Sequence, residues 1–360
     1  MKIGFKVRIY PNKEQEEKLF YFCKCSHEMW NYVVAKYKNS GEKIICGTYG
    51  VKGSSPQDLM REFIREDIPK RIYNDIAKKY SQTWKRVYNK IGRPPKFHKY
   101  NPNKQSFCIA SQTIKINDDN TINLSGVKKG RKCPVDMTFL NKYNIKTITE
   151  PRYTCSYGKW YVSGSCEVNV EPLGKTKSQL GLDWGIKDFM TTSNGIRINY
   201  PRTVLRQFYR VNSLKSKLSK KTKGSNNHQK LKEKIDKAYF RLENLKKDFI
   251  EQTTTELARE NNIAVEDLTN AKILMSNKNR RRLRIIAPLD RFTIVLEWKC
   301  KKFGRTFIKV NPAYTSMDCS RCGKRNLELT LKDRVYKCSC GLELDRDINA
   351  ACNIVARGFC

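Results

Sequence analysis

The sequence is poor in acidic residues and in long apolar stretches. Its 360 residues include 35 Asp and Glu against 72 Lys and Arg, which gives a formal net charge of +37. An enzyme that acts on small neutral molecules does not need such an excess of positive charge. A protein that binds a polyphosphate does, because each neutralised phosphate releases counterions. No apolar run reaches the roughly 18 residues of a membrane helix, so we expect no membrane span. The composition favours nucleic acid as the partner. A ribosome-associated protein would have the same excess of positive charge.

Histidine is scarce, and most cysteines stand alone. The three histidines, His27, His98 and His228, lie outside the motifs described below, and we assign them no catalytic role. The N-terminus alternates charged and apolar residues, which is typical of a strand and not of a signal peptide. The 14 cysteines do not resemble a secreted disulfide framework. We therefore expect an intracellular protein, in the cytoplasm or nucleoid of a prokaryote or in the nucleus of a eukaryotic or viral host.

Four cysteines near the C-terminus are the exception. Cys319-Ser-Arg-Cys322-Gly and Cys338-Ser-Cys340-Gly form two knuckles, and each ends in a glycine that permits a tight turn. Four thiolates suit tetrahedral Zn²⁺. The second knuckle has one residue between its cysteines instead of the usual two. We predict a closed, structural zinc site at Cys319, Cys322, Cys338 and Cys340, with free buried thiols as the alternative.

Three acids stand where the edge of a sheet could gather them. Asp183 and Glu266 each end a short apolar strand, and Asp347 begins a helix. Carboxylates that hold two Mg²⁺ about 3.5–4 Å apart can hydrolyse a phosphodiester, because one ion activates water and the other stabilises the leaving oxygen. Any one of these acids, taken alone, is more often a turn or cap residue. Three nearby acids compete for the same role: Asp188, Asp267 and Asp345.

Apolar periodicity predicts a β-rich N-terminal module that contains a helical insertion. Its predicted strands are 5–9, 107–109, 113–116, 121–124, 145–148 and 160–167. Its predicted helices are 13–37, with Asn12 as N-cap, 56–65 and 69–89, with a loop at 40–55 and a break at 92–96. Four aromatic residues recur at helical spacing: Tyr73, Tyr80, Trp84 and Tyr88. Aromatic residues so spaced are more often part of a core than stacked on nucleotides, so we favour a core role.

After a polar linker at 175–178 the pattern changes. Predicted strands at 180–183, 263–266 and 306–310 alternate with helices across 203–260, which break at Gly224, and at 288–302, with Phe292, Val295 and Trp298 on one side. Asn194-Gly195 predicts a hairpin over 190–199. A final helix at 347–355 has an apolar face.

With these residues in hand, the chain resembles the transposon-encoded TnpB family, its eukaryotic relatives the Fanzor proteins and, more distantly, compact type V CRISPR effectors. Gly181-Leu-Asp183-Trp-Gly-Ile-Lys is similar to the first RuvC motif, Val265-Glu266-Asp267-Leu to the second, and Asp345-Arg-Asp347-Ile-Asn-Ala-Ala to the third. Tyr314-Thr-Ser-x-x-Cys319-x-x-Cys322-Gly resembles the start of the family's zinc insertion, although the Cys-x-Cys knuckle departs from many members.

The resemblance implies a multidomain α+β fold. It consists of a β-barrel-like wedge domain with an inserted helical recognition lobe, followed by an RNase H-like (RuvC) α/β nuclease domain that carries a zinc-ribbon insertion. The implied boundaries are 1–11 and 105–174 for the wedge, 12–104 for the recognition lobe, 175–316 and 343–360 for RuvC, and 317–342 for the zinc-binding, target-nucleic-acid insertion.

The same resemblance implies an RNA-guided DNA endonuclease that cuts double-stranded DNA next to a short adjacent motif. Asp183, Glu266 and Asp347 would bind two catalytic Mg²⁺, and Arg346 would steady the scissile phosphate or serve a structural role. The implied partners are one transposon-end-derived omega RNA, as guide of a monomer, and the target DNA. Three other readings stay open: a nuclease-inactive RNA-guided DNA-binding regulator, a zinc-stabilised RNA-binding protein and a recombinase-type transposase.

Overall fold

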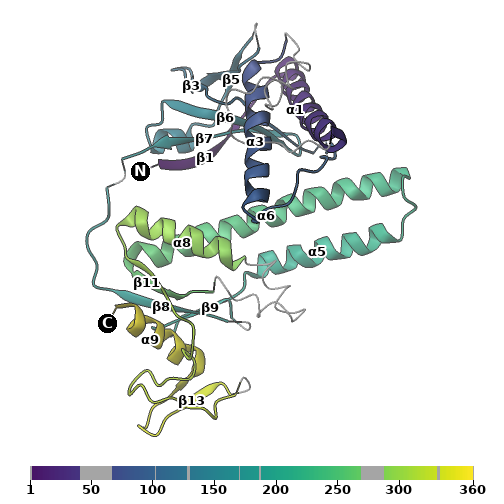
Figure 1. The fold of residues 1–360 in the computed structure, drawn as a ribbon. Helices are drawn as coiled ribbons and strands as arrows, with labels where there is room; N and C mark the ends of the chain where they lie inside the picture. Colours follow the sequence, from purple (N-terminus) through teal and green to yellow (C-terminus); the bar gives the residue numbers. More distant parts are fainter. Residues whose placement is uncertain are drawn as a thin grey trace. The chain divides into compact units, whose positions relative to one another are not determined.

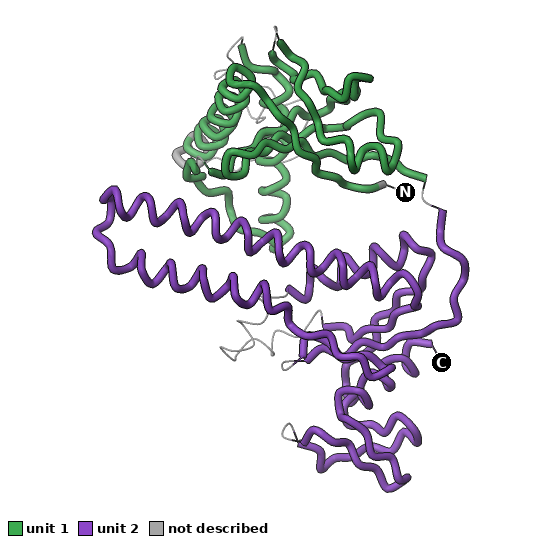
Figure 2. Tube along the Cα trace, turned by 180° about the vertical axis from the view of Figure 1, so that it is seen from behind, with its two compact units in different colours: residues 1–169 green, residues 170–360 purple. Residues whose placement is uncertain are grey.

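The chain divides into two compact units, residues 1–169 and 170–360 (Figure 2). The computed structural model describes residues 2–40, 67–101, 103–127, 130–169, 171–185, 188–268, 288–330 and 333–359. The helix predicted at 56–65, and nearly all of the loop predicted before it, lie outside these residues. None of the described helices is long and apolar enough to cross a membrane.

Unit 1 contains a five-stranded antiparallel sheet in the order β1-β7-β6-β2, with β3 also paired to β6. Its strands are β1 (Lys2–Ile9), β2 (Lys104–Cys108), β3 (Thr113–Lys115), β6 (Thr147–Ser156) and β7 (Lys159–Glu167), beside a hairpin of β4 (Thr121–Asn123) and β5 (Lys132–Pro134). The predicted alternation in the first strand is confirmed, because Phe5, Val7 and Ile9 are buried between more exposed residues.

One strand of unit 1 is much longer than its pattern predicts. β6 runs to Ser156, whereas the prediction stops at 148. The pairing of β6 with β7 shifts register between Thr149 and Arg152, and Glu150 has a positive φ of 49° just before Pro151. A bulge of this kind breaks the two-residue alternation, so the pattern stops where the strand does not.

The helices of unit 1 are α1 (Lys13–Ser40), α3 (Lys70–Tyr88) and the short α4 (Thr138–Lys142). The predicted cap of α1 is confirmed: Asn12 Oδ1 accepts from the Gln15 N–H at 2.9 Å, and Gln15 Oε1 accepts from the Asn12 N–H at 3.0 Å. Tyr73 and Tyr80 are buried, as predicted for core residues, whereas Tyr88 is 53% exposed. α1 and α3 share one hydrophobic core with the sheet.

Unit 2 is built on a mixed sheet in the order β10-β9-β8-β11-β12. Its strands are β8 (Gln179–Trp184), β9 (Met190–Thr192), β10 (Arg197–Ile198), β11 (Asn262–Glu266) and β12 (Phe307–Val310). β8, β11 and β12 are parallel, and β9 and β10 form the predicted antiparallel hairpin, in which Gly195 has a φ of 84°. A smaller hairpin of β13 (Val335–Lys337) and β14 (Glu343–Asp345) follows.

Helices cover both faces of this sheet (Figure 1). α6 (Asn226–Glu260) and α8 (Leu289–Phe303) cover one face and α9 (Arg346–Phe359) covers the other, while α5 (Arg202–Ser219) packs along α6. α6 and α8 share a core with Leu182 and Val265, and α9 packs on the opposite face, where Ile354 meets Ala264. Within α8 the face is rotated from the predicted one: Leu296 and Cys300 are buried together with Phe292, whereas Val295 and Trp298 are only half-buried.

α9 lies unusually close to β8 because Gly181 has no side chain. A Cβ at this position would lie 2.1 Å from the carbonyl oxygen of Ala351 and 2.7 Å from Cγ2 of Val355. Gly358 makes a second close approach, since a Cβ there would lie 2.8 Å from Cβ of Ala264. The two glycines let the backbone of the helix rest directly on the sheet.

We predict that Gly181→Ala destabilises the protein by about 1–3 kcal/mol or more, because the obstructing atom is a backbone oxygen that cannot rotate away. Urea-induced unfolding, followed by circular dichroism, measures the loss. Gly174→Ala is the matched control, since no heavy atom lies within 4 Å of a Cβ there. Equal stability of the two variants would contradict the close packing of α9 on β8.

Candidate functional site

The two acids at the strand ends point to the face of the sheet that α9 covers. Leu182 and Val265 are opposite each other in the parallel pair β8–β11, and both point into the core under α6 and α8. Successive side chains in a strand point to opposite faces. Asp183 and Glu266, one residue farther along each strand, therefore lie side by side on the α9 face at the same edge of the sheet.

Asp347 reaches this edge from the first turn of α9. Its neighbour Asp345 caps the helix, because Asp345 Oδ1 accepts from the backbone N–H groups of Asp347 at 3.0 Å and Ile348 at 3.3 Å. α9 packs on β8 and β11, and the charge of Asp347 acts on Asp183, so the start of the helix lies near the end of β8. The structure thus brings the three predicted acids, which are far apart in sequence, into one neighbourhood.

Asp183 lies close enough to Glu266 and Asp347 for their charges to act on it. Asp183 is only 8% exposed. Burial, followed by repulsion from Glu266 and Asp347, raises the pKa of Asp183 well above its usual range, and Arg346 opposes the shift. Burial also raises the pKa of Glu266, while a hydrogen bond from Thr315 and the charge of Arg357 oppose it. A bound cation would stabilise a buried carboxylate that two other carboxylates repel.

The three carboxylates are not drawn together as tightly as metal ligands in this conformation. Among the described residues, the only group of three or more potential ligands whose ligand atoms are close enough to hold an ion is the cysteine cluster. The carboxylate of Asp347 is instead paired with Arg346, at 3.5 Å, and with Arg334, at 3.9 Å.

The competing acids have other partners or lie at the surface. Arg197 pairs with Asp188 at 3.3 Å and with Asp345 at 2.5 Å, so it joins the hairpin to the cap of α9. Asp267 is exposed, and its backbone N–H continues the pairing with β12 by donating to Val310. Asp345 therefore serves as the cap of α9, and Arg197 links it to Asp188.

Sequence patterns missed three polar residues that connect the acids to the cysteine knuckles. Thr315, which is 2% exposed, donates to Glu266 Oε1 at 2.5 Å. On the buried side of α9, Asn353 donates to the carbonyl of Thr315 at 2.8 Å, and Asn349 donates to the carbonyl of Asp318 at 2.8 Å. The signal in the sequence was the pair of asparagines four residues apart on an otherwise apolar helix face, since such a pair shares one side of the helix.

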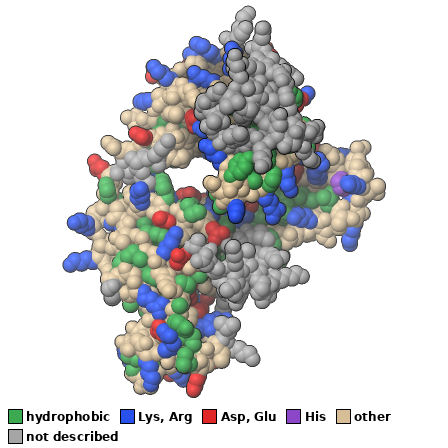
Figure 3. Space-filling model, viewed as in Figure 1, with side chains coloured by type: hydrophobic (Ala, Val, Ile, Leu, Met, Phe, Trp, Pro, Cys, Tyr) green, Lys and Arg blue, Asp and Glu red, His purple; other side chains and the backbone are tan. Residues whose placement is uncertain are grey.

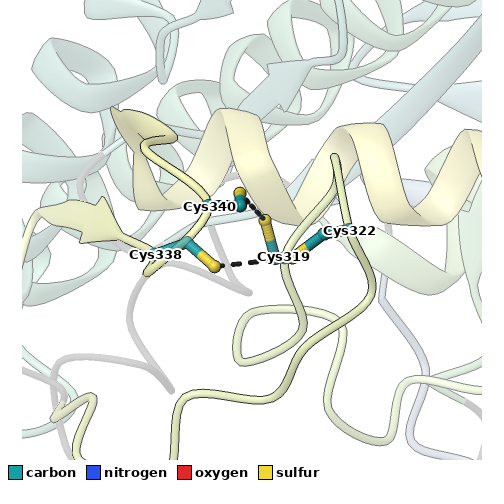
Figure 4. A group of neighbouring side chains, drawn as sticks. All are labelled: Cys319, Cys322, Cys338 and Cys340. Atoms are coloured by element: carbon teal, nitrogen blue, oxygen red, sulfur yellow. Dashed lines mark hydrogen bonds between the residues drawn. The ribbon is translucent and has the colours of Figure 1, made fainter.

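The four cysteines converge as predicted (Figure 4). The sulfur atoms of Cys319 and Cys340 are 3.7 Å apart, those of Cys322 and Cys338 are 3.6 Å apart, and all four lie within 4.8 Å of one another. With Zn–S bonds of about 2.3 Å, the corners of a sulfur tetrahedron lie about 3.8 Å apart. The cluster therefore fits a zinc ion, and the one-residue gap of the second knuckle does not prevent the fit.

The glycines of the knuckles have the predicted turn conformation. Gly323 and Gly341 have φ values of 76° and 83°, and their N–H groups donate to the carbonyls of Cys319 and Cys338. A hydrogen bond from the Cys340 backbone is the largest of the influences that lower the pKa of Cys338 to about 6, while hydrogen bonding with Cys338 helps to raise the pKa of Cys322 to about 11.

Unit 1 has a separate cationic groove of about 670 Å³ between α1, α3 and the segment before β2. Among the described residues, no acidic side chain lines the groove. Five basic residues do: Lys79, Arg86, Lys96, Lys99 and Lys104. His98 stacks on Trp30 at 4.6 Å beside the groove. In Figure 3, lysine and arginine side chains lie across both units on the face in view, so positive charge is not confined to one segment.

Three protein families match parts of the chain. Residues 290–354 match "Cas12f1-like, TNB domain", residues 163–276 match "Probable transposase" and residues 1–43 match "Helix-turn-helix domain". The last description does not fit the local structure, because the described residues from 2 to 40 form one strand and one helix of 28 residues.

Relatives share these regions. The chain is 34% identical over 204 residues to a "Putative RNA-guided DNA endonuclease" of Streptomyces pristinaespiralis, covering 56% of this chain and 50% of that protein. It therefore spans half the length of that relative. It is 26% identical over 379 residues to the "Putative RNA-guided DNA endonuclease InsQ" of Escherichia coli (strain K12), covering 99% of this chain and 92% of that protein.

A solved structure has a similar fold. The cryo-EM structure of a Cas12f1-sgRNA-target DNA complex matches with a TM-score of 0.60 at 15% identity, covering 99% of this chain and 98% of the Cas12f1 chain. At this identity the likeness concerns the mixed α/β fold alone.

We predict that Cys340→Ser abolishes zinc binding and lowers the melting temperature of unit 2, since structural zinc contributes directly to folding. Metal analysis of the purified protein and calorimetry measure the two effects. Cys352→Ser is the matched control, because Cys352 lies on α9 outside the cluster and its thiol donates to the Ser193 carbonyl. Full zinc content in the Cys340 variant would show that the cluster is not a metal site.

We predict that Asp183→Asn stabilises the magnesium-free protein at neutral pH. Folding raises the pKa of Asp183, so its carboxyl lowers the free energy of unfolding as pH rises from the unfolded pKa through the folded pKa. Below the unfolded pKa the carboxyl is protonated in both states, so the stability gained by the Asn variant should vanish near pH 4. Each kcal/mol relieved shifts the melting temperature by about 2–4 °C in a unit of this size.

Differential scanning fluorimetry of the zinc-loaded protein measures this gain. Added Mg²⁺ should stabilise the native protein and not the variant. Asp267→Asn is the control, since Asp267 is exposed at the same edge and should leave the melting temperature unchanged. A variant that melts below the native protein would show that Asp183 is a stabilising structural residue.

Proposed function

This chain belongs to the TnpB/IS605 transposase family, and on that premise we propose that it is an RNA-guided DNA endonuclease associated with a transposable element. It would cut double-stranded DNA next to a short adjacent motif. Its catalytic residues would be Asp183, Glu266 and Asp347. The observation that supports the proposal is that β8, β11 and α9 carry these acids to one edge of the sheet, where the charges of Glu266 and Asp347 act on Asp183.

The mixed sheet of unit 2 supports an RNase H-like (RuvC) assignment for residues 175–316 and 343–360. Two acids at the ends of adjacent parallel strands, with the third on a covering helix, are held by regular elements and not by loops. Two Mg²⁺ held by these carboxylates would activate the attacking water and stabilise the leaving oxygen. Asp347 would turn from Arg334 toward Asp183 to complete the site.

Arg346 suits a contact with the scissile phosphate. Its guanidinium is near enough to Asp183 to oppose the rise of that residue's pKa, and its Nη1 donates to the Thr330 carbonyl at 3.1 Å. Its Nε is buried and has no hydrogen-bond partner among the residues that the structure describes. A phosphate oxygen at the acids would supply the missing acceptor.

The zinc site would have a structural role. All four ligands are cysteine sulfurs, which leaves no open position for water. We assign residues 317–342 to a zinc-binding insertion that contacts target nucleic acid, between the two RuvC segments.

The charge of the chain supports the proposed partners, a transposon-end-derived omega RNA as guide and the target DNA. A net charge of +37 can hold a heteroduplex by its backbone while base pairing supplies specificity. In unit 1, where we place the recognition lobe at 12–104 and the wedge at 1–11 and 105–174, the cationic groove offers phosphate contacts. One chain would bind one RNA.

We predict that the protein purified with its own RNA cuts DNA that matches the RNA and leaves unmatched DNA intact. Asp183→Ala, Glu266→Ala and Asp347→Ala should each lower the cleavage rate by on the order of 10³-fold, since metal ligation supplies several kcal/mol of transition-state stabilisation. Sequencing of the bound RNA defines the guide, and single-turnover cleavage of labelled DNA measures the rate.

Asp267→Asn is the control and should cut at the native rate, while the three alanine variants should still bind RNA and DNA. A native complex that holds a guide and binds matched DNA in Mg²⁺ without cutting it would overturn the nuclease assignment and favour a regulator. Cutting that ignores the RNA sequence would overturn the guide.

A further inference from the structure

Glu266 has one protein donor on its carboxylate among the residues that the structure describes. The hydroxyl of Thr315 lies 2.5 Å from Glu266 Oε1. Thr315 is 2% exposed, so water does not compete for the contact. The hydrogen bond occupies Oε1 and leaves Oε2 as the oxygen that can turn to another partner.

The hydroxyl of Thr315 donates its hydrogen bond to Glu266. A threonine has one hydroxyl proton, and two acceptors are within reach: Glu266 Oε1 at 2.5 Å and the carbonyl of Pro312 at 3.1 Å. A charged acceptor at the shorter distance makes the stronger hydrogen bond. Thr315 therefore holds the orientation of the carboxylate and is not merely closing a local turn.

Thr315 is itself fixed to the helix that carries Asp347. Asn353 Nδ2, which is buried on α9, donates to the carbonyl of Thr315 at 2.8 Å and to the carbonyl of Asp318 at 2.7 Å. Arg357, one turn farther along α9, pairs with the carboxylate of Asp318 at 2.7 Å. Through Thr315, the end of β11 is thus tied to α9, and the two acids that they carry are positioned relative to each other.

We propose that Thr315 is a positioning residue of the nuclease site, which fixes the orientation of Glu266 relative to Asp183 and Asp347, the two carboxylates that would hold Mg²⁺ together with it. The inference rests on the proposed function, since it concerns the same carboxylates. Residues that orient metal ligands in this way change metal affinity by about 10–100-fold when they are removed.

Thr315→Val tests the proposal, because valine keeps the shape and removes the hydroxyl, and Thr315→Ser is the matched variant that retains it. Calorimetric titration of the RNA-bound, zinc-loaded protein with Mn²⁺ measures the affinity of the acid site without relying on cleavage. We expect Thr315→Val to weaken Mn²⁺ binding about tenfold or more and to lower kcat with little change in KM for target DNA. Thr315→Ser should restore both, and zinc content should stay at the native level in each variant.

Three results would overturn the proposal. If Thr315→Val binds Mn²⁺ like the native protein, the hydroxyl does not position Glu266, and the nuclease assignment still stands. If Thr315→Val loses zinc or melts earlier and Thr315→Ser does not recover Mn²⁺ binding, the role of Thr315 is structural. If the native protein and Glu266→Gln bind Mn²⁺ equally, the acids are not a metal site, and the proposed function fails together with the inference.

Discussion

The close packing of α9 on β8 and β11 is the contact on which the rest of unit 2 depends. It requires Gly181 on the strand and Gly358 on the helix, because a side chain at either position would meet neighbouring atoms at less than 3 Å. Because neither glycine has a side chain, the helix backbone rests on the sheet. The first turn of the helix then reaches the ends of the two parallel strands. A helix held even one side-chain layer farther away would leave Asp347 out of range of Asp183 and Glu266.

The same helix also joins the candidate nuclease site to the candidate zinc site. Its apolar side, with Ala351 and Ile354, packs on the sheet, whereas Asn349 and Asn353 hold the segment that precedes and begins the first cysteine knuckle. These asparagines are buried, and a buried amide is stable only when it is hydrogen-bonded. The same asparagines therefore link the first knuckle to the helix that carries Asp347.

Unit 2 holds three neighbouring acids, of which Asp183 is buried, in a chain that is otherwise strongly basic. Arginines balance part of the negative charge: Arg197 holds the helix cap, and Arg346 and Arg334 contact Asp347. The repulsion that remains is a cost to the stability of the fold. Such a cost is expected where residues are arranged for a ligand and not for the most stable apo structure.

The sequence alone determined the features that depend on local spacing: the cap at Asn12, the hairpin at Asn194-Gly195, strands ending in acids and four cysteines in two knuckles. These follow from turn chemistry and short periodicities, which each segment carries by itself. Only the tertiary structure decided which partner each acid has, since Asp345 pairs with Arg197 from 148 residues away and Glu266 accepts a hydrogen bond from Thr315 from 49 residues away. It also decided that β6 continues past its bulge, because pairing with β7 restores a strand that local alternation had lost. Contacts of this range are made by sheet register and helix packing, which no window of the sequence contains.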